Sequence, residues 1–220
     1  MRLTIYGRSV VLKVLFITLL LDIIALIVPV FYLKLALLGL SLLLFGFTLF
    51  FFRDPVRKLP EEIKDNHIIS PADGKVMMIE EIENESVFLQ SPARLIAIFL
   101  SPLNVHVNRI PVSGVIDYYE YIKGDYIVAF DHKSSERNER TIVGITNEKF
   151  KVLFKQIAGF VARRIICNTM MGSSVKAGDR FGMIRFGSRM DVIIPEHSNI
   201  LVSVNQKVTG GETILAEVTV

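Results

Sequence analysis

The sequence predicts a mostly β domain built from antiparallel sheets, with a minor α+β component, behind an N-terminal helical hairpin that spans a membrane. The first observation is composition: 51% of the 220 residues are hydrophobic and the mean hydropathy is +0.45, which is too apolar for an ordinary soluble domain. The second is that this excess is concentrated in residues 9–52. The third is a series of short β-branched runs, punctuated by Gly, Pro, Asn and Asp, which fills the chain beyond residue 60.

Residues 1–52 are predicted to form a membrane anchor. Between residues 9 and 52 the chain is an almost uninterrupted run of Leu, Ile, Val and Phe, long enough for two spans of about 20 residues each. Pro29 marks a break near the middle, so we expect helices over 10–28 and 35–52, rather than one long span or an in-plane hairpin. The charged exceptions are Lys13, Asp22 and Lys34.

Charge indicates the orientation of this anchor. Basic residues flank both ends of the apolar stretch, which predicts that both ends are cytoplasmic and that the rest of the chain lies on the cytoplasmic side of the cell membrane. That remainder holds 21 basic and 21 acidic residues, of 25 and 22 in all, so no nucleic-acid partner is expected. The flanking residues are Arg2 and Arg8 on one side and Arg53, Arg57 and Lys58 on the other.

Beyond the anchor, residues 53–66 are predicted to be a short linker and residues 67–220 one domain with a sizeable core. The single cysteine, Cys167, cannot form an internal disulfide, and its strand-like surroundings favour a buried structural thiol. The four histidines are scattered, and no Cys or His pair has metal-ligand spacing. Neither a Gly-rich phosphate loop nor a G-x-S-x-G turn occurs, so a metal enzyme or a standard hydrolase is not expected.

Five stretches stand out, in this order: FFRDPVR (51–57), SPADGKV (70–76), SPLNVHVNRIP (101–111), DHKSSERNER (131–140) and KAGDRFGMIRFGSRMDVIIP (176–195). Taken alone, a fragment such as SPADG is common turn chemistry. As an ordered set, the five resemble the phosphatidylserine decarboxylases, in particular the short, membrane-anchored branch that includes the archaetidylserine decarboxylases. The resemblance covers nearly all of the chain from Phe51 onward.

The resemblance implies a pyruvoyl enzyme, which is made as one chain and cuts itself at a Gly-Ser bond. The serine hydroxyl attacks the preceding carbonyl carbon, so the amide becomes an ester; a base takes the hydroxyl proton and hydrogen-bond donors stabilise the oxyanion. β-Elimination then leaves dehydroalanine, which hydrolyses to a pyruvoyl group and ammonia. The pyruvoyl ketone is the cofactor: it forms a Schiff base with the substrate amine and takes up the electron pair as carbon dioxide leaves.

The implied reaction converts a serine phospholipid, phosphatidylserine or archaetidylserine, to the ethanolamine phospholipid without a metal. The implied partners are this lipid, the membrane and the two chains that cleavage produces, residues 1–187 and 188–220. The family also suggests assembly into a homo-oligomer.

Two Gly-Ser pairs are candidates for the cut, and local chemistry does not choose between Gly172–Ser173 and Gly187–Ser188. In the family, the cut lies in a strand–turn–strand unit with glycines placed ahead of it. Gly178 and Gly182, together with Gly187 itself, match that frame, and MDVIIP follows as the outgoing strand. We therefore assign the cut to Gly187–Ser188, with Ser188 as the source of the pyruvoyl group, and interpret Gly172–Ser173 as an ordinary β-turn.

The residues that activate Ser188 are inferred from the resemblance. Asp73 matches the aspartate of an Asp-His-Ser arrangement that drives self-cleavage, although an Asx-turn aspartate is the alternative. Many relatives carry two histidines three residues apart before a proline; here His106 holds the first position and Arg109 the second. We expect His106 to act in cleavage or decarboxylation, although a histidine between two valines is more often structural. Arg109 stays protonated, so it is expected to hold an anionic carboxylate or phosphate instead.

Further substrate contacts are expected from two polar segments. Asn138 and Arg140, with Glu139 between them, match an active-site or headgroup loop, the alternative being a solvated loop. Arg185 and Arg189 flank the cut and are expected to meet the lipid phosphate, unless their strand positions turn them towards solvent.

A different class of protein also fits part of the pattern. SPADGKV followed by Gly-punctuated strands resembles the small β modules of lipoyl or biotinyl carriers and of membrane-fusion proteins. Such a carrier needs an exposed lysine at a hairpin tip, whereas the comparable turn here reads Gly-Ser-Arg.

Overall fold

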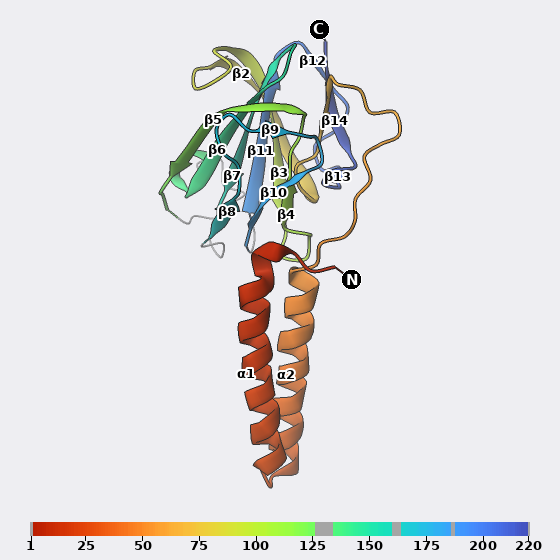
Figure 1. Ribbon diagram of the computed structural model, residues 1–220, viewed down its shortest axis with the longest axis vertical. Helices are drawn as coiled ribbons and strands as arrows, with labels where there is room; N and C mark the ends of the chain where they lie inside the picture. Colours follow the sequence, from red (N-terminus) through yellow and green to blue (C-terminus); the bar gives the residue numbers. More distant parts are fainter. Residues whose placement is uncertain (1, 126–133, 160–163, 186–187, 220) are drawn as a thin grey trace. The chain divides into compact units, whose positions relative to one another are not determined.

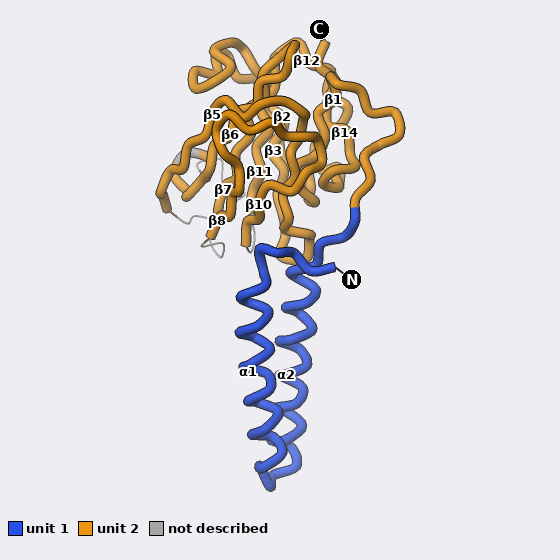
Figure 2. Tube along the Cα trace, viewed as in Figure 1, with its two compact units in different colours: residues 1–56 blue, residues 57–220 orange. Residues whose placement is uncertain are grey.

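The computed structural model describes residues 2–125, 134–159, 164–185 and 188–219 (Figure 1). The chain divides into two compact units, Met1–Val56 and Arg57–Val220 (Figure 2). The division into an anchor over 1–52, a linker over 53–66 and a domain over 67–220 stays a prediction, and each unit is described separately below.

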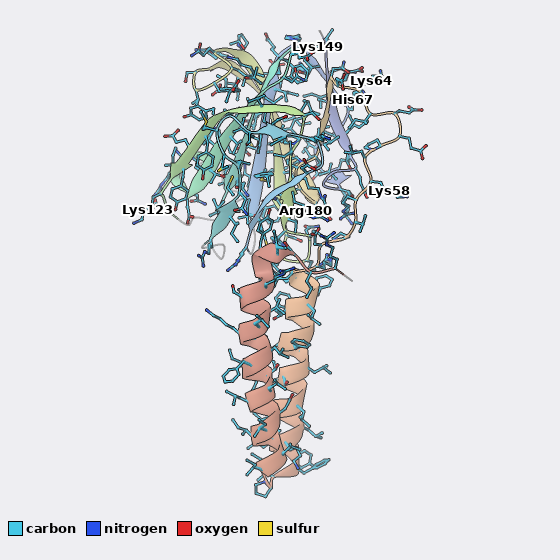
Figure 3. All side chains as sticks on the ribbon, in the orientation of Figure 1. Lys58, Lys64, His67, Lys123, Lys149 and Arg180 are labelled. Carbon is cyan, nitrogen blue, oxygen red and sulfur yellow. The ribbon has the colours of Figure 1, made fainter. Side chains whose placement is uncertain are left out.

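The first unit is a helical hairpin. A short 3-10 turn, η1 (Ile5–Gly7), precedes α1 (Arg8–Ile27), and three residues that include Pro29 lead into α2 (Phe31–Phe51). Both helices are long and apolar enough to cross a membrane, and most of their large apolar side chains are exposed (Figure 3). Most of the residues buried in the two helices are small, as helix pairs in lipid prefer: Thr18, Ala25, Ser41 and Thr48. The exception is Phe51, at the end of α2.

The predicted hairpin is confirmed, but its helix bounds were misplaced. The second helix was expected to start at residue 35, whereas it begins at Phe31, directly after Val30. The reason is that Pro29 interrupts the hydrogen-bonding pattern only locally, so a connection of three residues reverses the chain. Exposed apolar helices of this length are consistent with association with a membrane.

The second unit is built on an eight-stranded antiparallel sheet, as the β-branched runs predicted. Central strands β3, β11 and β7 lie side by side (Figure 1). In spatial order the strands are β13 (Lys207–Val208), β2 (Gly74–Glu85), β3 (Ser91–Leu100), β11 (Ser188–Pro195), β7 (Lys151–Ile157), β6 (Arg140–Thr146), β5 (Gly114–Ile122) and β9 (Ser174–Val175).

Two small antiparallel sheets complete this unit, and α3 (Ser134–Arg137) is the one helix in its described part. The strands of the first are β4 (Val107–Arg109), β10 (Arg180–Ile184) and β8 (Ile165–Cys167). The strands of the second are β1 (His67–Ile69), β14 (Ile214–Val218) and β12 (Ser198–Ile200).

Strand β11 is buried along its whole length because both faces of the sheet are covered. Its even-numbered apolar residues join the main core, which includes Phe154 of β7 and Phe181 of β10, whose rings meet edge to face at 5.2 Å. Ile193 points to the other face and packs in a smaller cluster with Leu95 and Leu153. Successive residues of a strand point to opposite faces, so Ser188 shares the main-core face while Arg189 does not.

Candidate active site

One end of the large sheet brings together stretches of the second unit that the sequence singled out. Strand β11 begins at Ser188, which pairs with Leu100 at the end of β3. At the same end, β2 begins beside β3, with Lys75 opposite Phe99, and β6 begins beside β7, with Arg140 opposite Ile157. The turn before β2, the loop after β3 and the segment before β6 therefore meet around the start of β11.

Ser188, the serine of the predicted cut, is the first residue of β11. It is 0% exposed, and its Oγ has no hydrogen-bond partner in the described parts of the chain. Strand β10 ends at Ile184 and β11 begins at Ser188, so a strand lies on each side of the predicted cut; Gly187 itself lies outside the described residues. Burying a hydroxyl without a partner costs about 1–3 kcal/mol, so this serine calls for an explanation beyond packing.

The other candidate serine has an ordinary environment. Ser173 is half-exposed in a turn, and its Oγ donates to the carbonyl of Met170 at 2.5 Å. Gly172 before it has φ +79° and open space around it, as in a surface β-turn. Local sequence did not distinguish the two Gly-Ser pairs, whereas their serines differ in burial and hydrogen bonding.

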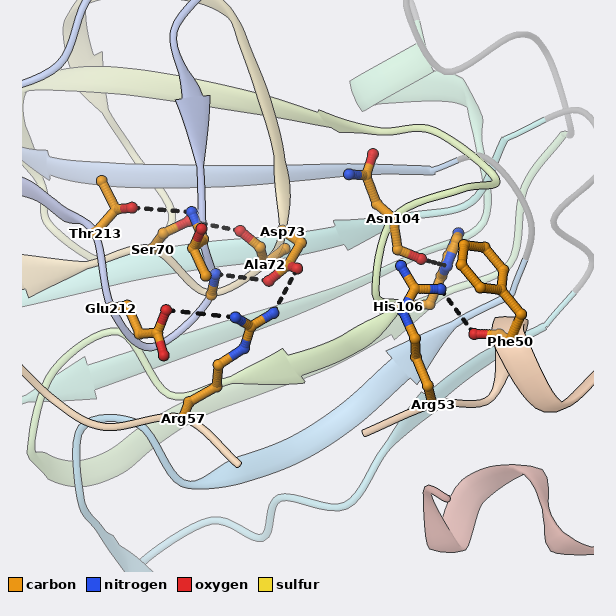
Figure 4. Close-up of polar contacts among 12 residues, drawn as sticks. Phe50, Arg53, Arg57, Ser70, Ala72, Asp73, Asn104, His106, Glu212 and Thr213 are labelled. Atoms are coloured by element: carbon orange, nitrogen blue, oxygen red, sulfur yellow. Dashed lines mark hydrogen bonds and ion pairs between the residues drawn. The ribbon is translucent and has the colours of Figure 1, made fainter. Parts of the chain in front are cut away.

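Asp73 lies in the turn that leads into β2 and is held from two sides (Figure 4). Its Oδ2 is 2.6 Å from Arg57 Nη2, and its Oδ1 accepts the backbone N–H of Gly210 at 2.9 Å. Gly74 fixes the turn against β3, because a Cβ there would overlap the carbonyl of Phe99. Strand β3 separates β2 from β11, so the backbones of Asp73 and Ser188 are about 10 Å apart, two strand spacings.

His106 is fully buried in the loop between β3 and β4. Its Nδ1 is 2.9 Å from the carbonyl oxygen of Asn104, and Figure 4 shows this contact. A carbonyl only accepts, so the neutral ring carries its proton on Nδ1 and presents Nε2 as its basic nitrogen. This loop leaves the sheet directly after Leu100, the strand partner of Ser188.

Asn138 and Glu139 are buried between β6 and the end of β7. Asn138 Nδ2 donates to the carbonyl of Ala158 at 2.7 Å, and Glu139 accepts from the Tyr121 hydroxyl at 3.1 Å. Burial, followed by the Glu139 charge, raises the pKa of Tyr121. Ala158 directly follows Ile157, which pairs with Arg189, so this segment reaches the level of Ser188.

Comparison with known proteins identifies the family. The model of the phosphatidylserine decarboxylase family matches residues 44–216. The phosphatidylserine decarboxylase proenzyme of Pelodictyon phaeoclathratiforme is 44% identical over 213 residues, 97% of this chain and 98% of the relative. The proenzyme of Chlorobium luteolum is 45% identical over 214 residues, 97% and 99% of the two chains, and that of Salinibacter ruber is 48% identical over 171 residues, 77% and 75%.

This chain belongs to the phosphatidylserine decarboxylase family. The ordered set of five stretches therefore predicted the family correctly, and the chain is a decarboxylase. Membership also favours the decarboxylase over the carrier-type β module.

The arginines of this phosphatidylserine decarboxylase family member differ sharply in their surroundings. Arg109 is buried, and its Nη1 donates to the carbonyl of Gly178 at 2.9 Å, which ties β4 to the turn before β10. Gly178 has φ +85°, a conformation that favours glycine. Arg140 is half-buried and its Nη1 donates to the carbonyl of Asn138 at 3.1 Å.

The two arginines that flank the cut lie in unlike environments. Arg189 is 1% exposed and paired with Asp191, on the opposite face of β11 from Ser188. Arg185 is half-buried and follows β10; burial, and then the nearby Arg164 charge, lower its pKa. Arg189 is therefore already neutralised by a carboxylate, whereas Arg185 lies near a second positive charge.

Sequence reasoning missed a buried polar network next to the predicted residues. Gln156 joins Thr141 to Asn108 by hydrogen bonds of 2.7 and 2.8 Å, and all three side chains are almost fully buried. One signal was available: Gln156 is an amide in the otherwise apolar alternation of KVLFKQI (151–157), at a core-facing position. The pairing with Asn108, 48 residues away, could not be predicted from that signal.

Proposed function

We propose that this chain is a proenzyme that cleaves itself between Gly187 and Ser188 and then decarboxylates a serine phospholipid to the ethanolamine phospholipid. The observation that supports this most directly is the buried Ser188 hydroxyl, which has no partner in the described residues, at the end of the sheet where the family stretches converge. Ser173, by contrast, has a satisfied hydroxyl in a surface turn.

The surroundings of Ser188 fit the pyruvoyl group that the family implies. Formed from Ser188, the group would stand at the start of β11, with Leu100 on the neighbouring strand and Met190 on the same face, both fully buried. These apolar neighbours exclude water from the position. When present, the pyruvoyl carbonyl supplies an acceptor for the electron pair that remains as carbon dioxide departs.

His106 is the base that we assign to self-cleavage. Its Nδ1 proton is engaged with Asn104, so Nε2 is the nitrogen that takes the proton of the Ser188 hydroxyl. The backbone of Asp73 is about 10 Å from that of Ser188. Its carboxylate already binds Arg57, so we assign Asp73 a supporting role in shaping the site.

For the lipid headgroup we propose Arg185 and Arg140 as the phosphate contacts. Both are half-buried, Arg140 begins β6 at the end of the sheet where β11 begins, and Arg185 lies near a second guanidinium, that of Arg164. Bringing a phosphate beside Arg185 and Arg164 would relieve their mutual repulsion. Three other predicted residues are assigned to positioning the walls of the site, because each already holds a group of the protein. Arg109 binds Gly178, Asn138 binds Ala158, and Arg189 binds Asp191.

The helical hairpin suits a substrate that resides in a bilayer. We propose that α1 and α2 span the cell membrane with both ends cytoplasmic. We also propose that the two chains produced by cleavage stay associated and that the mature enzyme forms a homo-oligomer. Phosphatidylserine and archaetidylserine present the same headgroup, so both are proposed substrates.

The test is the intact mass of the purified full-length protein, in wild-type form and as Ser188→Ala. We expect two species from wild type, residues 1–187 and residues 188–220 with the modified first residue, and a single chain from the variant. Ser173→Ala is the matched control and should be processed like wild type. A single full-length wild-type species would refute the proposal.

Activity then separates the substrates. Release of carbon dioxide from vesicles that contain phosphatidylserine or archaetidylserine should depend on processing, and free serine should not replace the lipid. Turnover of free serine at the rate seen with lipid would instead point to a soluble amino acid as the substrate.

A further inference from the structure

A chain of three hydrogen-bonded side chains runs from β6 through β7 to β4. Thr141 Oγ1 donates to Gln156 Oε1 at 2.7 Å, and Gln156 Nε2 donates to Asn108 Oδ1 at 2.8 Å. Asn108 and Gln156 are 0% exposed and Thr141 is 2% exposed. The network ends at Asn108 Nδ2, which is buried and has no acceptor in the described part of the chain.

The orientation of the Asn108 amide is fixed by its neighbours. Gln156 Nε2 also lies 3.2 Å from the backbone carbonyl of Ile166, which can only accept, so this atom is the nitrogen. The Asn108 atom that faces it must then be the oxygen. The two N–H groups of Asn108 are therefore available on the other side, as donors that the network does not use.

Asn108 faces the same interior as Ser188. Gln156 lies opposite Met190 on β11, and Ser188 is two residues before Met190, so Gln156 and Ser188 are diagonal neighbours on one face, about 7–8 Å apart. Asn108 contacts Gln156 from β4 and pairs with Gly182, whose missing side chain leaves room for the Gln156 amide. A buried donor without an acceptor thus stands near a buried hydroxyl without a partner.

We propose that Asn108 is a hydrogen-bond donor for self-cleavage, held in orientation by Gln156 and Thr141. The inference rests on the proposed cleavage at Ser188 and adds a residue to it. A donor that is unsatisfied before the reaction gains its acceptor when negative charge develops, which is how an oxyanion is stabilised selectively in the transition state.

The step balances without any added reagent. The Ser188 oxygen forms a bond to the preceding carbonyl carbon, the π electron pair of that carbonyl moves onto its oxygen, and the hydroxyl proton passes to the base. The pair then returns, the carbon–nitrogen bond breaks, and the nitrogen takes the proton from the base. Asn108 donates a hydrogen bond to the oxygen while it is negative and transfers no proton.

The experiment follows cleavage of newly synthesised full-length chain by intact mass over time. Asn108→Asp keeps the oxygen that Gln156 needs and removes the donor, so we expect cleavage about 10²-fold slower than wild type. Protonation would restore an O–H donor, so the ratio of the Asn108→Asp rate to the wild-type rate should rise as the pH is lowered. Thr141→Val removes the hydrogen bond that orients Gln156 but keeps the Asn108 donor, so its cleavage should slow less than that of Asn108→Asp, and its rate relative to wild type should not change with pH.

The outcomes are distinct. If wild type cleaves and Asn108→Asp cleaves as fast, Asn108 has no role in self-cleavage. If Thr141→Val and Asn108→Asp are slowed equally and neither rate depends on pH relative to wild type, the network is purely structural, and the proposal is overturned as well. If Asn108→Asp does not fold, Asn108→Leu, of similar volume and without a donor, takes its place with the same expected loss. Failure of wild type to cleave would instead refute the proposed function.

Discussion

Arg189 and Asp191 form an ion pair on the face of β11 opposite to Ser188, and each side chain is only 1% exposed. Arg189 Nε lies 2.5 Å from Asp191 Oδ1, Nη2 lies 3.1 Å from Oδ2, and the Ser135 hydroxyl donates to the same carboxylate at 2.8 Å. Both charges have lost their hydration, so the pair is stable only while it is complete. It also fastens α3 to the strand that begins with Ser188.

Breaking this pair from one side should destabilise the protein strongly. Asp191→Asn leaves the guanidinium of Arg189 buried without its counter-charge, and we expect a loss of about 3–5 kcal/mol in the free energy of unfolding, measured by urea denaturation in detergent. The double variant Arg189→Met/Asp191→Leu removes both charges and should fall close to wild type. An Asp191→Asn variant as stable as wild type would contradict a buried ion pair.

Gly182 should not tolerate a side chain. A Cβ there would overlap the carbonyl of Ile166 and press on the Gln156 amide at 3.0 Å, so Gly182→Ala should cost more than 2 kcal/mol and slow cleavage as well. Gly172→Ala is the control: φ is +79° but the space is open, so only about 1 kcal/mol is expected. Equal melting temperatures for the two variants would contradict the tight packing of β10 on β7.

Much of this fold was accessible from the sequence because its signals are local. The apolar run of residues 9–52 predicts a hairpin, and the β-branched runs predict strands, since both depend on periodicity and turn chemistry. The surroundings of Ser188 were not accessible in that way. Two Gly-Ser pairs look alike in sequence, and only the long-range pairing of Ser188 with Leu100 shows which hydroxyl is buried.

The surroundings of the two arginines beside the proposed cut could not be predicted from the sequence either. Arg185 and Arg189 both flank the proposed cut, so sequence proximity suggested one shared role. Strand alternation turns Arg189 away from Ser188, and its partner Asp191 is two residues along the same strand. The alternation along β11 could be read from the sequence. Whether the face with Arg189 meets solvent or a second core depends on α3, whose packing no local signal specifies.

Cys167 provides a pH-dependent test of burial. Desolvation raises the pKa of its thiol, in spite of hydrogen bonds with Thr169 that act the other way. The unfolded thiol ionises near pH 8.5, so the contribution of Cys167 to stability is complete below that pH and is lost as pH rises through the higher folded pKa. We expect the melting temperature of wild type relative to Cys167→Ala to fall between pH 7 and pH 9.5. A difference that does not change with pH would show that the thiol titrates alike in both states.

Variants of Asp73 and of its partner Arg57 test whether this aspartate supports the site or only caps a turn. The side chains lie 2.6 Å apart and are each 17% exposed, and the second carboxylate oxygen accepts the Gly210 N–H at 2.9 Å. Asp73→Asn keeps that backbone bond and loses the charge, whereas Arg57→Met keeps the charge and removes its partner. For a pair with this little exposure we expect each single variant to lose about 1–2 kcal/mol of stability, measured by urea denaturation, and the double variant to lose less than their sum.

Cleavage, followed by intact mass, should slow more in Asp73→Asn than in Arg57→Met if the carboxylate acts on the site, because only the first removes it. Equal cleavage rates in the two variants, with coupled losses of stability, would assign Asp73 to the turn alone.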